Sequence, residues 1–186
     1  MTTIAIIVAA GRGSRAGGGL PKQWRTVAGR RVADWPIDAF RVSPMVDQIV
    51  LVVHPDDADQ FQSIDNVRIA FGGSTRDESV RNGLEALENS DCDKILIHDV
   101  ARPCVSADII AEVVRALADS TGAAPALAVT GALWTGQNGR VSGLQDRNHL
   151  FRAQTPQGFR YADILRAHRE STGPASDDVE IALRAG

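Results

Sequence analysis

The residue types that could do chemistry gather in one segment, which follows the first apolar run of the chain. Residues 9–23 hold five glycines, two arginines and Lys22. Glycines let backbone N–H groups approach a phosphate closely, and Arg15 and Lys22 would add fixed positive charge in the same loop. Such charge suits a nucleoside triphosphate, because negative charge accumulates around phosphorus as it is attacked. The segment therefore indicates a triphosphate-binding loop, with a surface loop of incidental charges as the alternative.

Two other phosphate-binding patterns fit this loop poorly. Gly11, Gly13 and Ala16 formally match the GxGxxG/A fingerprint of dinucleotide-binding folds. That fingerprint should open a helix, which the glycine run after Ala16 and then Pro21 disfavour. The acidic residue expected about 20 positions later is also not in register. The P-loop pattern fails because Lys22 is followed by glutamine where Ser or Thr is required.

The composition is that of one ordinary globular domain. The 186 residues are 44% apolar and 23% charged, and their net charge of −3 argues against a dedicated nucleic-acid binder. The longest apolar run, Ile4–Ala10, is too short to span a membrane, and no secretory signal pattern precedes it. Cys92 and Cys104 supply neither a disulfide framework nor a CxxC metal site. We therefore expect a cytoplasmic protein with no membrane or nucleic-acid partner.

Short β-branched runs predict the strands that would position the loop. Strands are expected over Ile4–Ala10, Gln48–His54, Val67–Phe71, Lys94–Val100 and Ala126–Val129, each read as a buried parallel strand. Helices are expected between them: Thr75 and Glu78 form a capping-box signature, and Ser106 precedes an amphipathic pattern. Arg30–Arg41 is a weaker helix candidate. This alternation predicts an α/β fold with a mostly parallel sheet.

The pattern changes over Trp134–Gln145, where polar residues alternate with apolar ones. The turn signal Gln137-Asn138-Gly139 predicts a β-hairpin. A lone hairpin is marginally stable without something to pack on. A dimerisation arm is therefore one interpretation, and a surface hairpin is the other.

Four blocks together resemble a known family of enzymes. They are Ala9-Ala10-Gly11-x-Gly13-x-Arg15 with Pro21-Lys22-Gln23, Gly72-Gly73-Ser74-Thr75-Arg76-x-x-Ser79, His98-Asp99-Val100-Ala101-Arg102-Pro103-Cys104, and Asp146-Arg147 with Thr155-Pro156-Gln157. In this order they resemble the 2-C-methyl-D-erythritol 4-phosphate cytidylyltransferases, enzymes of non-mevalonate isoprenoid biosynthesis. The sequences of residues 130–134 (TGALW) and 151–159 (FRAQTPQGF) are most similar to the amino-terminal half of a bifunctional form, which also carries a 2,4-cyclodiphosphate synthase domain.

The resemblance implies a Rossmann-like nucleotidyltransferase fold, with helices on both faces of the sheet, and assigns roles to matching residues. Arg15 and Lys22 match the catalytic residues that stabilise charge at the α-phosphate. Ala9, Ala10, Gly11, Gly13, Gly73, Ser74 and Ser79 match nucleotide-binding positions. Arg147, Asp99, Val100 and Arg102 match substrate-facing positions, and Arg102 could instead brace its turn. Ser79 lies in the first turn of the helix that Thr75 caps, where we expect free N–H groups to serve the ligand.

The family's reaction needs positioning and charge stabilisation rather than a general base. A phosphate oxygen of methylerythritol phosphate attacks the α-phosphorus of CTP, and pyrophosphate leaves. The resemblance implies magnesium held mainly by the triphosphate, so we expect no protein metal cage. It also implies a homodimer in which residues 131–148 form the arm and Arg147 serves the partner subunit's site.

This chain departs from the family pattern at three places, of which the first, Val8 and Ala16 in place of common Pro and Met, is expected to be a tolerable packing change. Gly131 and Ala132 stand where members carry an acidic residue and a threonine that contacts the substrate phosphate. The family also continues with a last strand and a D-N-x-K motif, whereas the last lysine here is Lys94. We therefore expect residues 1–186 to be a single domain that is C-terminally truncated or cut from a longer protein. Alternatives are another sugar- or polyol-phosphate nucleotidyltransferase, or an inactive CTP-binding dimer.

Other conspicuous residues receive structural interpretations. His98 is expected to be a satisfied structural histidine, and the remaining histidines receive no role. The acidic residues Asp177, Asp178 and Glu180 are expected to cap a helix. Cys104 is expected to be buried, and the three tryptophans, Trp24, Trp35 and Trp134, are expected to serve packing.

Overall fold

A six-stranded sheet forms the centre of the molecule, of which the computed structural model describes residues 1–13, 20–61 and 66–186. In spatial order the strands are β5 (Val67–Phe71), β4 (Gln48–Val53), β1 (Thr3–Ala9), β6 (Lys94–Asp99), β12 (Gln157–Arg160) and β7 (Gly122–Ala123). The first four pair in parallel, and β12 is antiparallel to both β6 and β7. The predicted α/β class with a mostly parallel sheet is confirmed.

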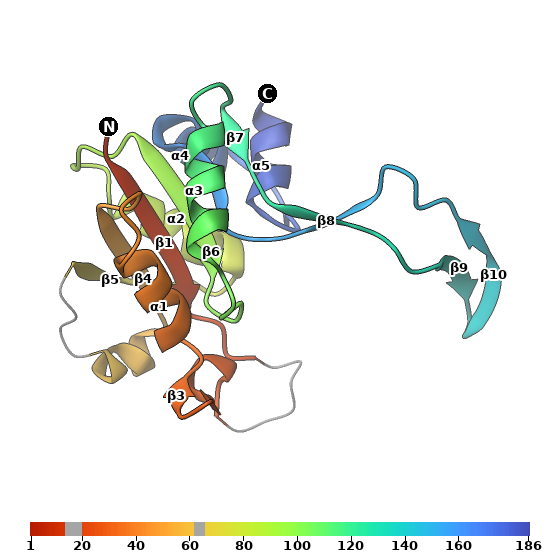
Figure 1. The fold of residues 1–186 in the computed structure, drawn as a ribbon, viewed down its shortest axis with the longest axis horizontal. Coiled ribbons are helices and arrows are strands. Elements are labelled where there is room, and N and C mark those ends of the chain that lie inside the picture. Colours follow the sequence, from red (N-terminus) through yellow and green to blue (C-terminus); the bar gives the residue numbers. More distant parts are fainter. Residues whose placement is uncertain (14–19, 62–65) are drawn as a thin grey trace.

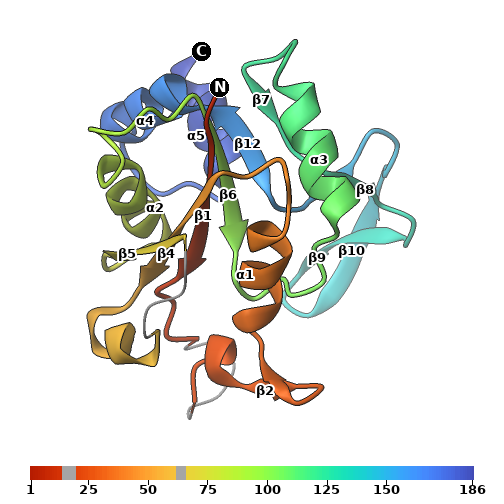
Figure 2. The ribbon, with the colours of Figure 1, turned by 60° about the vertical axis from the view of Figure 1, so that its left-hand side comes forward.

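Helices cover both faces of this sheet (Figures 1 and 2). They are α1 (Asp34–Arg41), α2 (Arg76–Glu85), α3 (Ala107–Ala116), α4 (Tyr161–Glu170) and α5 (Asp178–Ala185). Ile4 and Ile6 pack with α2, α4 and α5 on one face, whereas Ala5 and Ile7 pack with α1 and α3 on the other. Because successive side chains of a strand point to opposite faces, a strand buried on both sides reads as an unbroken apolar run.

Local sequence signals mark where most helices begin. The side chain of Thr75 accepts a hydrogen bond from the backbone of Glu78 at the start of α2, and Ser106 caps α3 in the same way. The weaker candidate Arg30–Arg41 is only partly correct. The helix begins at Asp34, because Arg30–Arg31 (β3) pairs with Thr26–Val27 (β2) in a short hairpin.

The chain order of the strands places a switch point between β1 and β6. From β1 the chain runs outward through β4 and β5, and then crosses back through α2 to β6 on the opposite side of β1. Two neighbouring strands thus send their following loops in different directions at one edge of the sheet. In open α/β sheets, ligands bind at the carboxyl ends of the strands where this happens.

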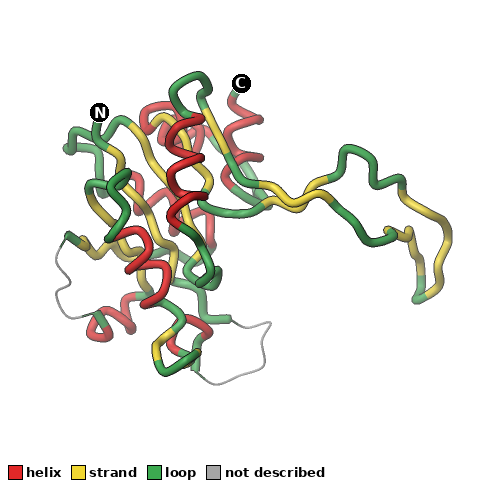
Figure 3. The backbone as a smooth tube through the Cα atoms, in the orientation of Figure 1, coloured by secondary structure: helices red, strands yellow, loops and turns green. Residues whose placement is uncertain are grey.

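A two-tiered arm extends from the body of the molecule (Figure 3). At its base β8 (Ala126–Ala128) pairs with β11 (Phe151–Ala153), and at its end β9 (Leu133–Gln137) pairs with β10 (Arg140–Gln145). Asn138 and Gly139 adopt positive φ angles of 51° and 74°, as the tight hairpin turn requires. The predicted hairpin is confirmed, but the interpretation of Ala126–Val129 as a buried parallel strand is wrong. Its strand is exposed and antiparallel, and lies outside the main sheet.

Apolar side chains of the arm face solvent in the single chain. Trp134 is 66% exposed and Leu144 is 80% exposed, so the expectation that Trp134 serves packing is wrong within one chain. Trp24, by contrast, is buried and packs against Phe61 with its ring tilted by 51°, as expected. None of the helices in the described ranges is both long and apolar enough to cross a membrane.

Candidate active site

A cavity of about 590 Å³ opens at the switch point between β1 and β6. Its walls come from the loop after β1, the start of α2 and the turn after β6. The lining residues are Val8, Ala10, Gly11, Arg12, Gly13, Lys22, Gln23, His54, Gly73, Ser74, Thr75, Arg76, Ser79, Asp99, Val100, Ala101 and Arg102. Three of the four sequence blocks singled out above therefore meet at one place, although they are far apart along the chain.

Gln23 holds in place the first part of the glycine-rich segment 9–23, which we call the glycine loop. Its side chain is buried, and Nε2 donates to the carbonyl oxygens of Ala9 (2.8 Å) and Gly11 (3.0 Å). Gly13 has a φ of +66°, a conformation that glycine adopts without strain. The predicted positions Ala10, Gly11 and Gly13 line the cavity, whereas Ala9 lies behind them in the core.

Arg12 anchors the same loop from the side. Its guanidinium donates to Asp57 (3.0 Å) and Asp56 (2.6 Å) in the short helix η3 (Pro55–Gln60), and lies 2.7 Å from Nδ1 of His54. The Asp57 side chain is largely buried, so its pairing with Arg12 is less screened than a surface pair would be. Arg12 therefore joins the wall of the cavity to the body of the protein.

Of the two residues predicted to be catalytic, the structure describes only Lys22. Lys22 begins the short helix η2 (Lys22–Trp24), is exposed to solvent and lines the cavity beside Gly13. Its ammonium group can therefore reach an anion held by the glycine loop. Arg15 lies outside the described residues.

The second block of glycines packs tightly under the start of α2. A Cβ added to Gly72 would overlap Cβ of Ala10 and would come within 2.8 Å of Oγ of Ser79. Only glycine therefore allows this turn to approach the loop after β1. Ser74 donates from both its backbone N–H (2.7 Å) and its hydroxyl (2.6 Å) to Glu78, and these bonds hold the pKa of Glu78 below its ordinary value.

Ser79 acts through its neighbours rather than through a free N–H group. Its backbone N–H donates to the carbonyl of Thr75 (3.0 Å), so the expectation that this N–H is free for a ligand is wrong. Its hydroxyl donates to the same carbonyl and accepts from the N–H of Gly73 at 3.1 Å. Ser79 thus fixes the backbone of Gly73, which lines the cavity beside it.

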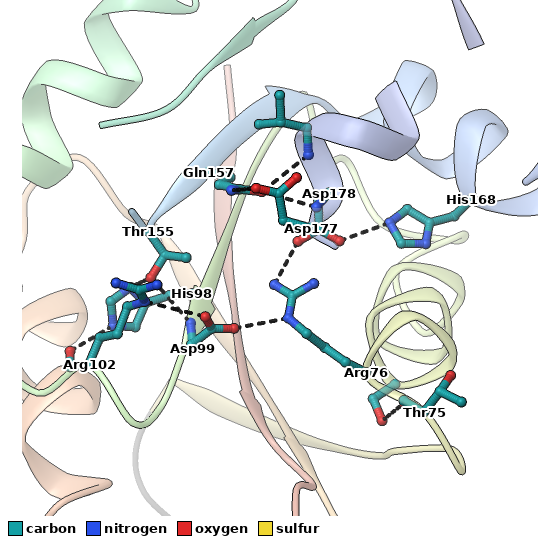
Figure 4. Close-up of polar contacts among 12 residues, drawn as sticks. Thr75, Arg76, His98, Asp99, Arg102, Thr155, Gln157, His168, Asp177 and Asp178 are labelled. Carbon is teal, nitrogen blue, oxygen red and sulfur yellow. Dashed lines mark hydrogen bonds and ion pairs between the residues drawn. The ribbon is translucent and has the colours of Figure 1, made fainter. Parts of the chain in front are cut away.

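The turn after β6 is supported by a buried histidine (Figure 4). Nε2 of His98 faces the carbonyl of Arg102 (3.1 Å), and Nδ1 faces the hydroxyl of Thr155 (2.9 Å). Because a carbonyl can only accept, Nε2 carries the proton and Nδ1 accepts from Thr155. Burial lowers the pKa of His98 to about 4. The expected structural role of His98 is confirmed.

Asp99 is held between two arginines at the rim of the cavity. Nε of Arg76 donates to Oδ1 (3.1 Å), and Nε of Arg102 donates to Oδ2 (3.4 Å). Arg102 also donates to the side chain of Gln154 at 2.6 Å, so it braces the turn as the second interpretation expected. Val100 is buried and lines the cavity next to Asp99.

Several predictions made from the sequence need correction, and several residues were missed. Asp177 caps α5 by accepting from Glu180, but Asp178 is wholly buried and pairs with Arg76 and His168 instead of capping. Cys104 is exposed, not buried. Gln23 and Arg76 lie within the quoted blocks without an assigned role, and their positions in those blocks were the only available signal.

Arg147 stands apart from the cavity of its own chain. It lies on the exposed return segment of the arm, and its guanidinium donates to the carbonyl of Thr130. It is not among the residues that line the cavity. One chain therefore brings together every described site residue assigned from the sequence except Ala9, which lies just behind the cavity, and Arg147.

The donor set facing the cavity does not form a metal cage. No group of three or more His, Cys, Asp or Glu side chains able to hold a metal ion occurs in the described ranges. Asp99 is the one carboxylate among the lining residues, and it faces a cavity that also contains Lys22. This set fits a magnesium ion carried by substrate phosphates, which needs one or two carboxylates and keeps most of its waters.

Comparisons with known proteins agree on one family. The family model described as "IspD: 2-C-methyl-D-erythritol 4-phosphate cytidylyltransferase" matches residues 3–186. The bifunctional enzyme IspD/IspF of Ruegeria pomeroyi is 58% identical over all of this chain, which spans 49% of that protein's length. The 2-C-methyl-D-erythritol 4-phosphate cytidylyltransferase of Cereibacter sphaeroides is 53% identical, and the chain spans 85% of it.

Solved structures give the same result. The crystal structure of 2-C-methyl-D-erythritol 4-phosphate cytidylyltransferase from Thermus thermophilus matches with a TM-score of 0.81 and 30% identity, over 99% of this chain and 84% of that one. The bifunctional IspDF of Campylobacter jejuni has the same fold, with a TM-score of 0.84 over 48% of its length. With its switch-point cavity, its glycine loop and this similarity over nearly every residue, the chain belongs to the 2-C-methyl-D-erythritol 4-phosphate cytidylyltransferase family.

Proposed function

We propose that the protein transfers CMP from CTP to 2-C-methyl-D-erythritol 4-phosphate in non-mevalonate isoprenoid biosynthesis. The products are 4-diphosphocytidyl-2-C-methyl-D-erythritol and pyrophosphate. One observation carries the proposal: in a member of this family, the glycine loop, Lys22, the start of α2 and Asp99 surround a single cavity. The reaction uses small polar substrates, and we assign it to the cytoplasm.

In the proposed reaction, a phosphate oxygen of the methylerythritol phosphate attacks the α-phosphorus of CTP in line. A new P–O bond forms, the bond to the β-phosphate oxygen breaks, and pyrophosphate leaves with its electron pair. The attacking phosphate monoester is nucleophilic near neutral pH, so no side chain needs to remove a proton. Lys22 and Arg15 stabilise the negative charge that grows on the α-phosphoryl oxygens. The glycine loop and the backbone of Gly73 and Ser74 hold the nucleotide.

Magnesium fits this site as a companion of the triphosphate. Asp99 is the lining carboxylate that would contact the ion, directly or through water, and substrate oxygens and solvent would supply the remaining ligands. When bound, the ion neutralises charge on the phosphates and supports the departure of pyrophosphate.

A homodimer would complete the site through the arm. The exposed apolar side chains of Trp134 and Leu144 need a partner surface, and Arg147 lies at the return of the same arm. We propose that residues 131–148 reach the partner subunit, where Arg147 binds the phosphate of methylerythritol phosphate.

Release of pyrophosphate with CTP, magnesium and methylerythritol phosphate tests the proposed function. Release should require both substrates, and Arg15→Ala should lower it about 100-fold, the scale of losing one donor that stabilises charge. Replacement of CTP by UTP, GTP or ATP should abolish it. Release with a different nucleotide would point to another nucleotidyltransferase, and CTP binding without release would point to an inactive binding module.

A further inference from the structure

A wholly buried carboxylate lies behind the nucleotide cavity. Asp178, the first residue of α5, is 0% exposed and receives contacts from His168 Nε2 (3.1 Å) and Arg76 Nη2 (2.8 Å). Its backbone N–H donates to the side chain of Gln157 at 3.1 Å. Burial alone would raise the pKa of Asp178, but the hydrogen bond from His168 and the charge of Arg76 bring it below its ordinary value. Asp178 is therefore an ionised group inside the protein.

Helix capping does not account for this buried charge. The capping side chain of α5 is Asp177, which accepts from the backbone N–H of Glu180 at 3.0 Å. Gln157 also accepts from the backbone N–H of Val179 at 3.2 Å. The backbone N–H groups at the start of α5 thus have hydrogen-bond acceptors without the carboxylate of Asp178. A buried ion pair is at best weakly stabilising compared with apolar packing, so its presence calls for another explanation.

Arg76 joins Asp178 to the cavity (Figure 4). One edge of its guanidinium donates to Asp178, and Nε donates to Oδ1 of Asp99 at 3.1 Å. Burial alone would lower the pKa of Arg76, but the two carboxylates raise it above its ordinary value, so the charge is permanent. The planar guanidinium fixes the angle between its two partners, which a lysine ammonium could not do.

Asp99 is the end of this chain of contacts. Its carboxylate is about one-third exposed and lines the cavity, while Arg76 and Arg102 each hold one oxygen. Without Arg76, Oδ1 would lose its hydrogen bond from Nε, and the remaining bond, from Arg102 to Oδ2, is long, at 3.4 Å. The side chain would then be free to leave the rotamer that faces the cavity.

We propose that Arg76 and Asp178 are positioning residues for the nucleotidyl-transfer site: Asp178 orients Arg76, and Arg76 orients the carboxylate of Asp99 toward the substrates. Through these contacts α5, which packs against α4, contributes to substrate binding. The inference rests on the proposed function, because it takes Asp99 as a residue that faces the substrates.

Two conservative variants test this role. Asp178→Asn keeps the shape of the side chain and removes its charge. Arg76→Lys keeps the charge and removes the planar guanidinium that donates to both carboxylates. It is the milder change if Asp178→Asn folds poorly. The matched control is Arg169→Gln, because Arg169 also links α4 to α2, through surface pairs with Glu85 and Glu88 that do not reach the cavity. For each variant we would measure thermal unfolding, the Kd for CTP with magnesium, and KM and kcat for both substrates.

A positioning role predicts that the effect of Asp178 is exerted through Asp99. Asp178→Asn and Arg76→Lys should each raise, by about tenfold, the same Kd or KM that Asp99→Asn raises, since one lost charge-assisted hydrogen bond changes binding on this scale. The double variant Asp99→Asn with Asp178→Asn should be no worse than Asp99→Asn alone, because residues that act through one another are non-additive. Arg169→Gln should leave every constant unchanged.

Three results would overturn the proposal. One is a lower unfolding temperature with unchanged substrate constants, which is what a purely structural ion pair would give. Another is a double variant, Asp99→Asn with Asp178→Asn, whose Kd or KM is raised by the product of the two single effects. A third is an unmodified protein that does not bind CTP, which would remove the proposed function as well. If the unmodified protein binds CTP without releasing pyrophosphate, only the transfer reaction fails, and the CTP Kd values still decide the role of Arg76 and Asp178.

Discussion

Gln23 donates a hydrogen bond from its side-chain amide to the carbonyl of Gly11 at 3.0 Å, and its second amide hydrogen goes to Ala9 at 2.8 Å. Both hydrogens of one buried side chain thus support the backbone that faces the cavity. Gln23→Met should leave two carbonyls unsatisfied and lower the free energy of unfolding by about 1–3 kcal/mol. It should also weaken CTP binding, because the loop loses its support. Urea denaturation and calorimetric titration with CTP would check both effects, and a destabilised variant with unchanged CTP affinity would contradict the second.

Gly11 and Gly72 should respond differently to the same substitution. Apart from its two chain neighbours, no atom of the residues that the structure describes lies within 4 Å of a Cβ added to Gly11, whereas one added to Gly72 would overlap Ala10. Gly72→Ala should therefore destabilise the fold by about 1–3 kcal/mol through overpacking. Gly11→Ala should leave stability unchanged but reduce CTP affinity, because the new methyl group would occupy space needed by the phosphates. Equal thermal stability of the two variants would show that the packing argument is wrong.

Lys22 should contribute to the chemical step rather than to folding. Its side chain is exposed at the cavity, so its loss should leave the packing of the described residues unchanged. Lys22→Ala should lower kcat about 100-fold with little change in unfolding temperature, because a fixed positive charge near the developing phosphoryl charge is removed. Steady-state release of pyrophosphate would measure this, and a variant with full kcat and a raised KM for CTP alone would assign Lys22 to ground-state binding.

His98 should make the fold less stable as the solution becomes acidic. Its pKa lies at about 4 in the folded protein, below its ordinary value of 6.5, because burial penalises the charged ring. Between these pH values the unfolded chain binds more protons than the folded chain, so stability is lost as pH falls, by up to about 3 kcal/mol. Denaturation at several pH values should show this loss, and His98→Gln should flatten it. The exposed arm residue His149 offers a control, since His149→Gln should keep the slope of the unmodified protein.

Removal of the arm should separate dimerisation from folding. The arm's strands β9 and β10 pair with each other and are almost wholly exposed. Replacement of residues 131–148 by a short glycine-rich turn should keep the unfolding temperature of the body, while converting a dimer into a monomer and abolishing transfer. Analytical ultracentrifugation at several concentrations would give the oligomeric state, and a variant that remains dimeric would refute the role proposed for the arm.

The elements that depend on local signals could be predicted from residue order alone. The strand Val67–Phe71 has the predicted bounds, Thr75 and Ser106 cap helices, and the turn at Asn138-Gly139 forms as expected. Such features depend on side chains within a few positions of one another, so a linear pattern contains them. The four sequence blocks likewise sufficed to indicate the family, and three of them supply most of the residues that line the cavity.

Only the tertiary structure decided which groups are buried and which distant groups meet. The apolar segment at Ala126–Ala128 has the composition of a core strand, yet it lies exposed in the arm, because burial depends on what packs against a strand. Asp178 has the local setting of a capping residue, yet it pairs with Arg76, 102 positions earlier. Crossover through α2 places Arg76 at the switch point beside β1, whereas Asp178 reaches Arg76 from the start of α5. Since contacts of such long range arise from packing, no local pattern encodes them.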